Sequence, residues 1–164
     1  TILEVLTTRV RKASEEIMGR DVTSATNPGF RLLKLAPSNF SVWDPGRIEG
    51  DQNKLEQQLF EHVEHVLPER TTLDVLFELM LKSRFELSTP FEQFEVGNCE
   101  VWKIAGGEMV AIIDPGLTIE VIREVASWKP GSVVILDRCF GADDSLKSNA
   151  RKIFEDAKID LKTV

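Results

Sequence analysis

The sequence predicts an α/β fold, with an N-terminal helical arm and a helix pair followed by a small mixed sheet with flanking helices. Apolar residues recur at helical spacing in the first half of the chain, whereas from residue 91 onward short apolar runs alternate with turns and helical segments. The 164 residues, 42% hydrophobic and 29% charged, suffice for one compact domain with an arm. We expect three segments: 1–28 (arm and linker), 29–90 (strand plus helix pair) and 91–164 (C-terminal α/β module).

The arm is predicted as an amphipathic helix that ends near Gly19. Its apolar stripe recurs every three or four residues and consists of Ile2, Leu6, Val10, Ala13 and Ile17. Residues 21–29 are rich in turn formers and predict a loop. The short apolar stretch 30–35, bounded by Gly29 and Pro37, favours a strand, and residues 39–43 are a second extended candidate.

Two helices are predicted next, joined by a short link. Asp51 is placed to cap the first, and Pro68 ends it; its buried stripe would be Leu55, Leu59, Val63 and Val66. Thr71 or Thr72 can cap the second, which Pro90 interrupts; its inward residues would be Leu73, Leu76, Phe77 and Met80.

In residues 91–164, the apolar runs 100–104 and 109–113 flank Gly106-Gly107 and predict a β-hairpin. Thr118 can cap a helix that leads to the apolar run 133–136. Such a run is typical of a central parallel strand, and the helix before it would supply the crossover. A further helix, with Leu146 and Phe154 among its apolar residues, and a last strand at 161–164 complete the module.

The formal net charge of −7 argues against a domain that grips nucleic acid through most of its surface. Arg9, Arg11 and Lys12 are the local exception: on an amphipathic helix they either contact a phosphate or a partner, or form its solvated face. The sequence contains no apolar stretch of bilayer length and no basic leader, so we expect no membrane partner and a cytoplasmic location. Cys99 and Cys139 lie far apart without a C-x-x-C pair, which favours reduced, buried thiols.

Three aspartates are the main candidates for ligand chemistry. Asp137, Asp143 and Asp144 lie around the carboxyl end of the predicted central strand, where open α/β sheets place their ligands. They could hold Mg²⁺, as in a small magnesium-dependent enzyme that handles phosphate. Alternatively, Asp143 or Asp144 caps the next helix and Asp137 ends the strand.

Other candidate sites have a simple structural alternative. His62 and His65 could share a metal or lie on a solvated helix flank. Trp43, Trp102 and Trp128 would form an interaction surface if exposed together, but packing within separate segments is the simpler expectation.

Three stretches resemble the C-terminal region of type III modification methyltransferases. Residues 9–13 are similar to the R-I-R-R-A helix that follows the methyltransferase core, and residues 29–44 to G-F-R-x-x-K-L-x-x-S-N-F-x-x-W-D. The third stretch has two parts. Residues 136–150 are similar to L-D-x-x-F-x-x-D-D-x-L-K-T-N, and residues 162–164 are similar to the terminal K-T-[IV] that follows it. The matches keep the family's order, while residues 45–130 match only in general character.

The resemblance implies a parent subunit that transfers a methyl group from S-adenosylmethionine to N6 of a flipped adenine in duplex DNA. The family's D-P-P-Y and F-x-G-x-G motifs do not occur in this sequence, so no catalytic or cofactor-binding residue carries over. Both motifs precede the matched stretches in the family, and the absence of a starting methionine agrees with a piece of a longer subunit. The segment is therefore expected to serve assembly, with the methyltransferase core, the restriction subunit and a second modification subunit as partners, and with DNA reached through the complex.

Overall fold

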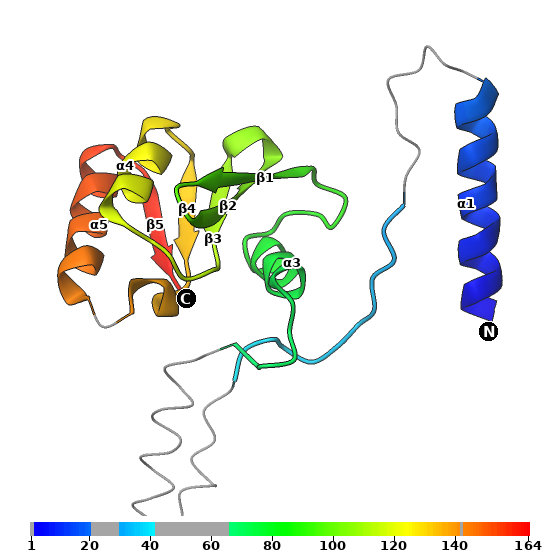
Figure 1. Ribbon diagram of the computed structural model, residues 1–164, viewed down its shortest axis with the longest axis horizontal. Helices are drawn as coiled ribbons and strands as arrows, with labels where there is room; N and C mark the ends of the chain where they lie inside the picture. Colours follow the sequence, from blue (N-terminus) through cyan, green and yellow to red (C-terminus); the bar gives the residue numbers. More distant parts are fainter. Residues whose placement is uncertain (1, 21–29, 42–65, 142) are drawn as a thin grey trace, which may run out of the picture. The chain divides into compact units, whose positions relative to one another are not determined.

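The computed structural model describes residues 2–20, 30–41, 66–141 and 143–164, and divides into two compact units, 1–37 and 38–164 (Figure 1). In the first unit, α1 (Ile2–Arg20) confirms the predicted arm helix. Its apolar residues are exposed. None of the helices in the described ranges is long and apolar enough to cross a membrane.

The strand predicted at 30–35 is wrong. Residues 30–36 have no regular secondary structure, and Leu35 is 99% exposed. A strand is held by backbone hydrogen bonds to a neighbour, and no described residue pairs with this stretch. Segment length and flanking turn formers are local features, so they could not indicate whether another strand pairs with residues 30–35.

The second unit contains a five-stranded mixed sheet in the order β1-β2-β3-β4-β5 (Figure 1), which confirms the predicted fold class. The strands are β1 (Phe91–Val96), β2 (Cys99–Ile104), β3 (Met109–Ile112), β4 (Ser132–Ile135) and β5 (Asp160–Thr163). The first three pair antiparallel and the last three parallel. The predicted central strand is β4, which is parallel to both of its neighbours.

Hairpin turns build the antiparallel half of the sheet. β2 and β3 are joined at Ala105–Gly107, where Gly106 has a φ of 67°, as expected for the predicted glycine turn. A second hairpin, which the sequence analysis missed, joins β1 to β2 through Gly97-Asn98, with Gly97 at a φ of 62°. β1 is therefore the edge strand of the sheet.

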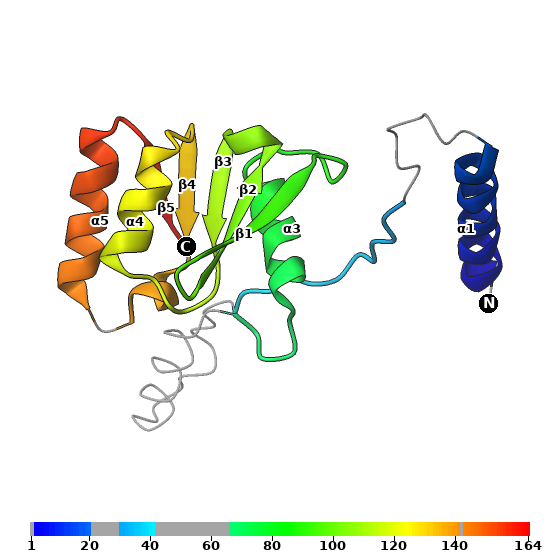
Figure 2. The same ribbon diagram turned by 45° about the horizontal axis from the view of Figure 1, so that its top comes forward.

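Two helices cover one face of the sheet. α4 (Ile119–Ser127) begins at the predicted cap Thr118 and supplies the crossover between β3 and β4, and α5 (Asp144–Asp156) leads from β4 to β5. They lie side by side, while α3 (Thr72–Lys82) lies on the opposite face (Figures 1 and 2). The core fills both interfaces, and every residue of β3 is buried.

α3 begins at the predicted cap Thr71, which forms a reciprocal capping box with Asp74. Its inward face differs from the prediction, because Val75 and Leu79 are buried with Leu76 and Met80, whereas Leu73 is 43% exposed. Most of the helix predicted before it lies outside the described residues. Its last stripe position, Val66, instead makes an isolated antiparallel bridge with Phe40.

Candidate functional site

Residues 137–147 make contacts that join three elements at the carboxyl end of β4. The Asp137 carboxylate forms an ion pair with the ammonium group of Lys147 on α5. The backbone N–H of Asp137 donates to the carbonyl of Val164 at 2.7 Å. Arg138 donates two hydrogen bonds to the carbonyl of Ile113, at 3.3 and 3.1 Å, at the end of β3. These contacts fasten the end of β4 to α5, to β3 and to the last residue of the chain.

The other two aspartates do not face Asp137 as a ligand set. Asp143 caps α5 by accepting a hydrogen bond from the Leu146 N–H at 2.9 Å, and Asp144 lies exposed in the first turn of that helix. Within the described ranges, no three acidic, histidine or cysteine side chains are grouped so that they could hold a metal ion. Asp137 thus follows the strand and Asp143 caps the helix, as in the alternative that the sequence offered to a magnesium site, while Asp144 begins α5.

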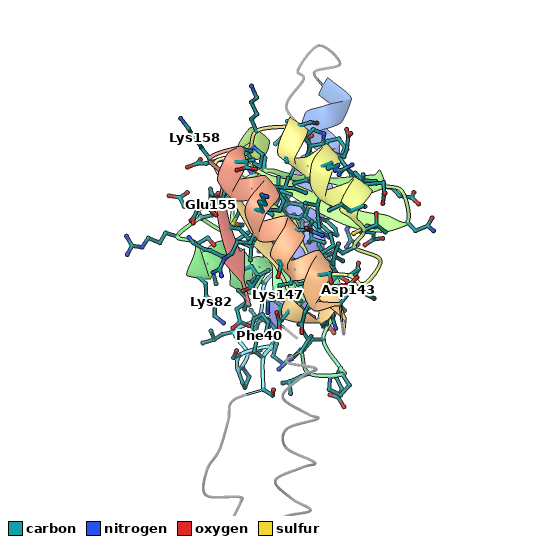
Figure 3. All side chains as sticks on the ribbon, turned by 90° about the vertical axis from the view of Figure 1, so that its left-hand side faces the viewer. Phe40, Lys82, Asp143, Lys147, Glu155 and Lys158 are labelled. Atoms are coloured by element: carbon teal, nitrogen blue, oxygen red, sulfur yellow. The ribbon has the colours of Figure 1, made fainter. Side chains whose placement is uncertain are left out.

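Ser38 and Asn39 are anchored on α3 through Glu78. Its carboxylate accepts hydrogen bonds from the Ser38 hydroxyl, from the Asn39 N–H and from the Asn39 side-chain amide, at 2.7, 2.7 and 2.8 Å. Burial opposes ionisation of Glu78, but these hydrogen bonds, together with Lys82, lower its pKa below the ordinary value. Lys82 also lies 4.3 Å above the ring of Phe40 (Figure 3).

The basic candidates Arg9, Arg11 and Lys12 lie exposed on α1, in the first unit. Their exposure agrees equally with contact to a phosphate or a partner and with the solvated face of the helix. His62, His65 and Trp43 lie outside the described residues. Trp102 is buried in the sheet and Trp128 is half-buried after α4, and they lie on opposite faces.

An open groove of about 810 Å³ lies between the β1–β2 hairpin and α4. Its apolar residues are Phe94, Val96, Val121 and Trp128, and the carboxylates of Glu120 and Glu124 on α4 lie at its rim. The rings of Phe94 and Trp128 lie 5.7 Å apart, and the Trp128 indole N–H donates to Glu124 at 3.2 Å. The groove was not predicted because β1 was not predicted, although Phe91, Phe94 and Val96 between Pro90 and Gly97 could have indicated a short strand.

Two further carboxyl groups meet on the α3 side of the sheet. A hydrogen bond with Asp114 raises the pKa of Glu100, and burial and the negative charges of Asp114 and Glu95 raise it further. Glu95 lies directly opposite Glu100 in the β1–β2 register. The Thr72 hydroxyl donates to Asp114 at 3.4 Å. Glu100 therefore binds a proton more tightly than an isolated glutamate would.

Both cysteines are buried free thiols, as the sequence predicts. Burial raises the pKa of Cys139 to about 12 and also raises the pKa of Cys99. Because the thiolate is the reactive form, neither side chain has the character of a nucleophile.

Comparison of the chain with the models of protein families and with curated protein sequences found no match.

Proposed function

We propose that this chain is a non-catalytic assembly segment from the C-terminal part of a type III modification subunit, a DNA adenine-N6 methyltransferase. The resemblance in three ordered stretches is the basis of this proposal. Its structural support is the role of the matched residues: Ser38 and Asn39 bind α3, and Asp137 and Lys147 close the carboxyl end of the sheet. The matched residues hold a module together, which is the role expected of an architectural segment.

The cofactor of the parent subunit would be S-adenosylmethionine, held by motifs that this sequence does not contain. The expected partners are the methyltransferase core of the same subunit, the restriction subunit and a second modification subunit. Duplex DNA would be reached through the assembled complex, because the net charge of −7 disfavours binding along most of this surface.

The proposal is tested by using the purified chain to capture the restriction subunit and the methyltransferase core, with S-adenosylmethionine binding measured by calorimetry on the same sample. We expect capture of at least one protein and no heat of cofactor binding. Cofactor binding by the chain, or capture of neither protein, would contradict the proposal.

A deletion supplies the complementary test. A modification subunit truncated before residue 66 should lose restriction-subunit binding or self-association while it retains S-adenosylmethionine binding. The control is the intact subunit carrying Glu155→Ala, which removes one exposed side chain of α5 and should leave assembly unchanged. A truncated subunit that assembles normally would rule out this role.

A further inference from the structure

The groove between the β1–β2 hairpin and α4 has an uncovered apolar floor. On this face of the sheet the β3 residues are buried beneath the helices, whereas Phe94 on the edge strand is 37% exposed. Phe94 and Trp128 present their rings to the same space, one from the strand and the other from the end of α4. Exposed aromatic surface of this kind, rimmed by polar groups, is typical of an interaction site.

The groove already places one cation beside its aromatic rings. The ammonium group of Lys103 on β2 lies 5.8 Å from the centroid of Phe94 and 5.6 Å from that of Trp128. Aromatic faces attract cations, and the planar guanidinium of arginine stacks on them especially well. The rings can therefore receive a basic side chain from a partner as well as an apolar one.

The rim is acidic. Its two carboxylates, those of Glu120 and Glu124, both come from α4. Glu120 and Glu124 take no part in the ion pairs Glu78–Lys82, Asp137–Lys147 and Asp160–Lys162 of the described residues. Glu120 accepts hydrogen bonds from its own N–H and from Thr118, which lower its pKa and keep it charged at neutral pH. Two carboxylates thus favour a cationic occupant, which must compete with the Lys103 ammonium at the rings and with Arg123 near Glu120.

We propose that this groove binds a basic segment of a partner protein, in which arginine or lysine side chains meet the carboxylates of Glu120 and Glu124 and an apolar side chain packs on Phe94 and Trp128. The inference rests on the groove alone and holds whether or not the chain is part of a methyltransferase. It identifies a docking surface and the chemistry of its partner.

The probe is a short fluorescein-labelled peptide of alternating arginine and leucine, and binding to the full chain is followed by fluorescence anisotropy. Two matched peptides replace arginine by glutamate or leucine by serine. We expect the arginine-leucine peptide to bind best, with an affinity that falls as salt is added. Equal binding of the arginine-serine peptide, or no binding of the arginine-leucine peptide, would overturn the proposal.

Variants locate the binding site. Glu120→Gln combined with Glu124→Gln removes two rim charges and should weaken binding by about fivefold, since exposed ion pairs contribute little individually. The control, Glu108→Gln combined with Glu155→Gln, changes the net charge equally at exposed positions outside the groove and should leave binding within about twofold. An equal loss in both would mean that the peptide responds only to net charge, and the proposal would fail.

Two further measurements do not depend on the charged variants. Phe94→Ala removes the exposed part of the apolar floor and should weaken binding by about fivefold, with circular dichroism confirming that the sheet is retained. In the nitrogen-15 spectrum of the wild-type chain, the Trp128 indole signal, assigned with Trp128→Phe, should shift on titration while that of buried Trp102 stays in place. Binding that leaves the Trp128 signal unmoved, or that survives Phe94→Ala undiminished, would place the peptide elsewhere.

Discussion

Glu78 binds Asn39 through two hydrogen bonds, one to its backbone N–H and one to its side-chain amide. Asn39 is only 8% exposed, and its side chain also donates to the carbonyl of Asp74 at 2.9 Å. One carboxylate on α3 thus satisfies a buried polar residue from a segment 39 positions earlier in the chain. The contact attaches an irregular segment to the folded unit.

Glu78→Ala should lower the free energy of unfolding by about 2 kcal/mol, because buried donors of Asn39 lose their acceptor. Denaturant unfolding measures the change, and Glu155→Ala on the exposed side of α5 serves as the control. The lowered pKa of Glu78 adds a pH dependence. Its stabilising contribution is present above the ordinary glutamate pKa and disappears as the pH falls through the lowered value. A loss below about 0.5 kcal/mol, the range of ordinary surface substitutions, would show that Asn39 finds another acceptor.

Asp143→Ala should lower the free energy of unfolding by about 1 kcal/mol, because α5 loses its N-terminal cap. Asp144→Ala, one residue later in the exposed first turn, removes an equal charge without removing the cap and should cost about half as much. Thermal melting compares the two variants. If Mg²⁺ raises the melting temperature of the wild type and Asp143→Ala abolishes that increase, the aspartates bind the ion and the magnesium interpretation gains support.

Glu100→Gln should raise the melting temperature at neutral pH, because it removes a negative charge next to Asp114 and Glu95. The raised pKa means that the folded chain holds the Glu100 proton more tightly than the unfolded chain. The Glu100 charge therefore stops destabilising the fold as the pH falls through that pKa. The difference in melting temperature between the variant and the wild type should shrink in acid. Glu92→Gln, at an exposed position of the same hairpin, should show no such pH dependence. If the melting temperatures of the two variants changed with pH in the same way, the charge repulsion between Glu100 and its neighbours would not destabilise the fold.

Cys139 should not react with an aromatic disulfide reagent in the native chain at pH 8, because its pKa of about 12 leaves almost no thiolate and its side chain is buried. Cys99 should behave in the same way, for the same two reasons. Both should react at once in denaturant, and absorbance of the released thiolate counts them. Rapid labelling of a native thiol would show that the core opens far more readily than its packing suggests.

The sequence determined the fold class and most of residues 91–164. Glycine turns, helix caps and the apolar run of β4 are local signals, and each led to the correct element, with Thr71, Thr118 and Asp143 at the starts of α3, α4 and α5. Likewise, the absence of the methyltransferase motifs is a property of the sequence alone.

Only the tertiary structure decided which segments find partners. Residues 30–35 have the composition of a strand but pair with none of the residues that the structure describes, whereas residues 91–96 were not predicted and form the edge strand beside the groove. The contacts of Asp137 and Glu78 could not be predicted from the sequence either. The partner of Asp137 lies 10 positions away in the chain, and the partners of Glu78 lie 39 and 40 positions away. Periodicity and capping report interactions within a few residues, while pairing, burial and charge clusters depend on residues that only folding brings together.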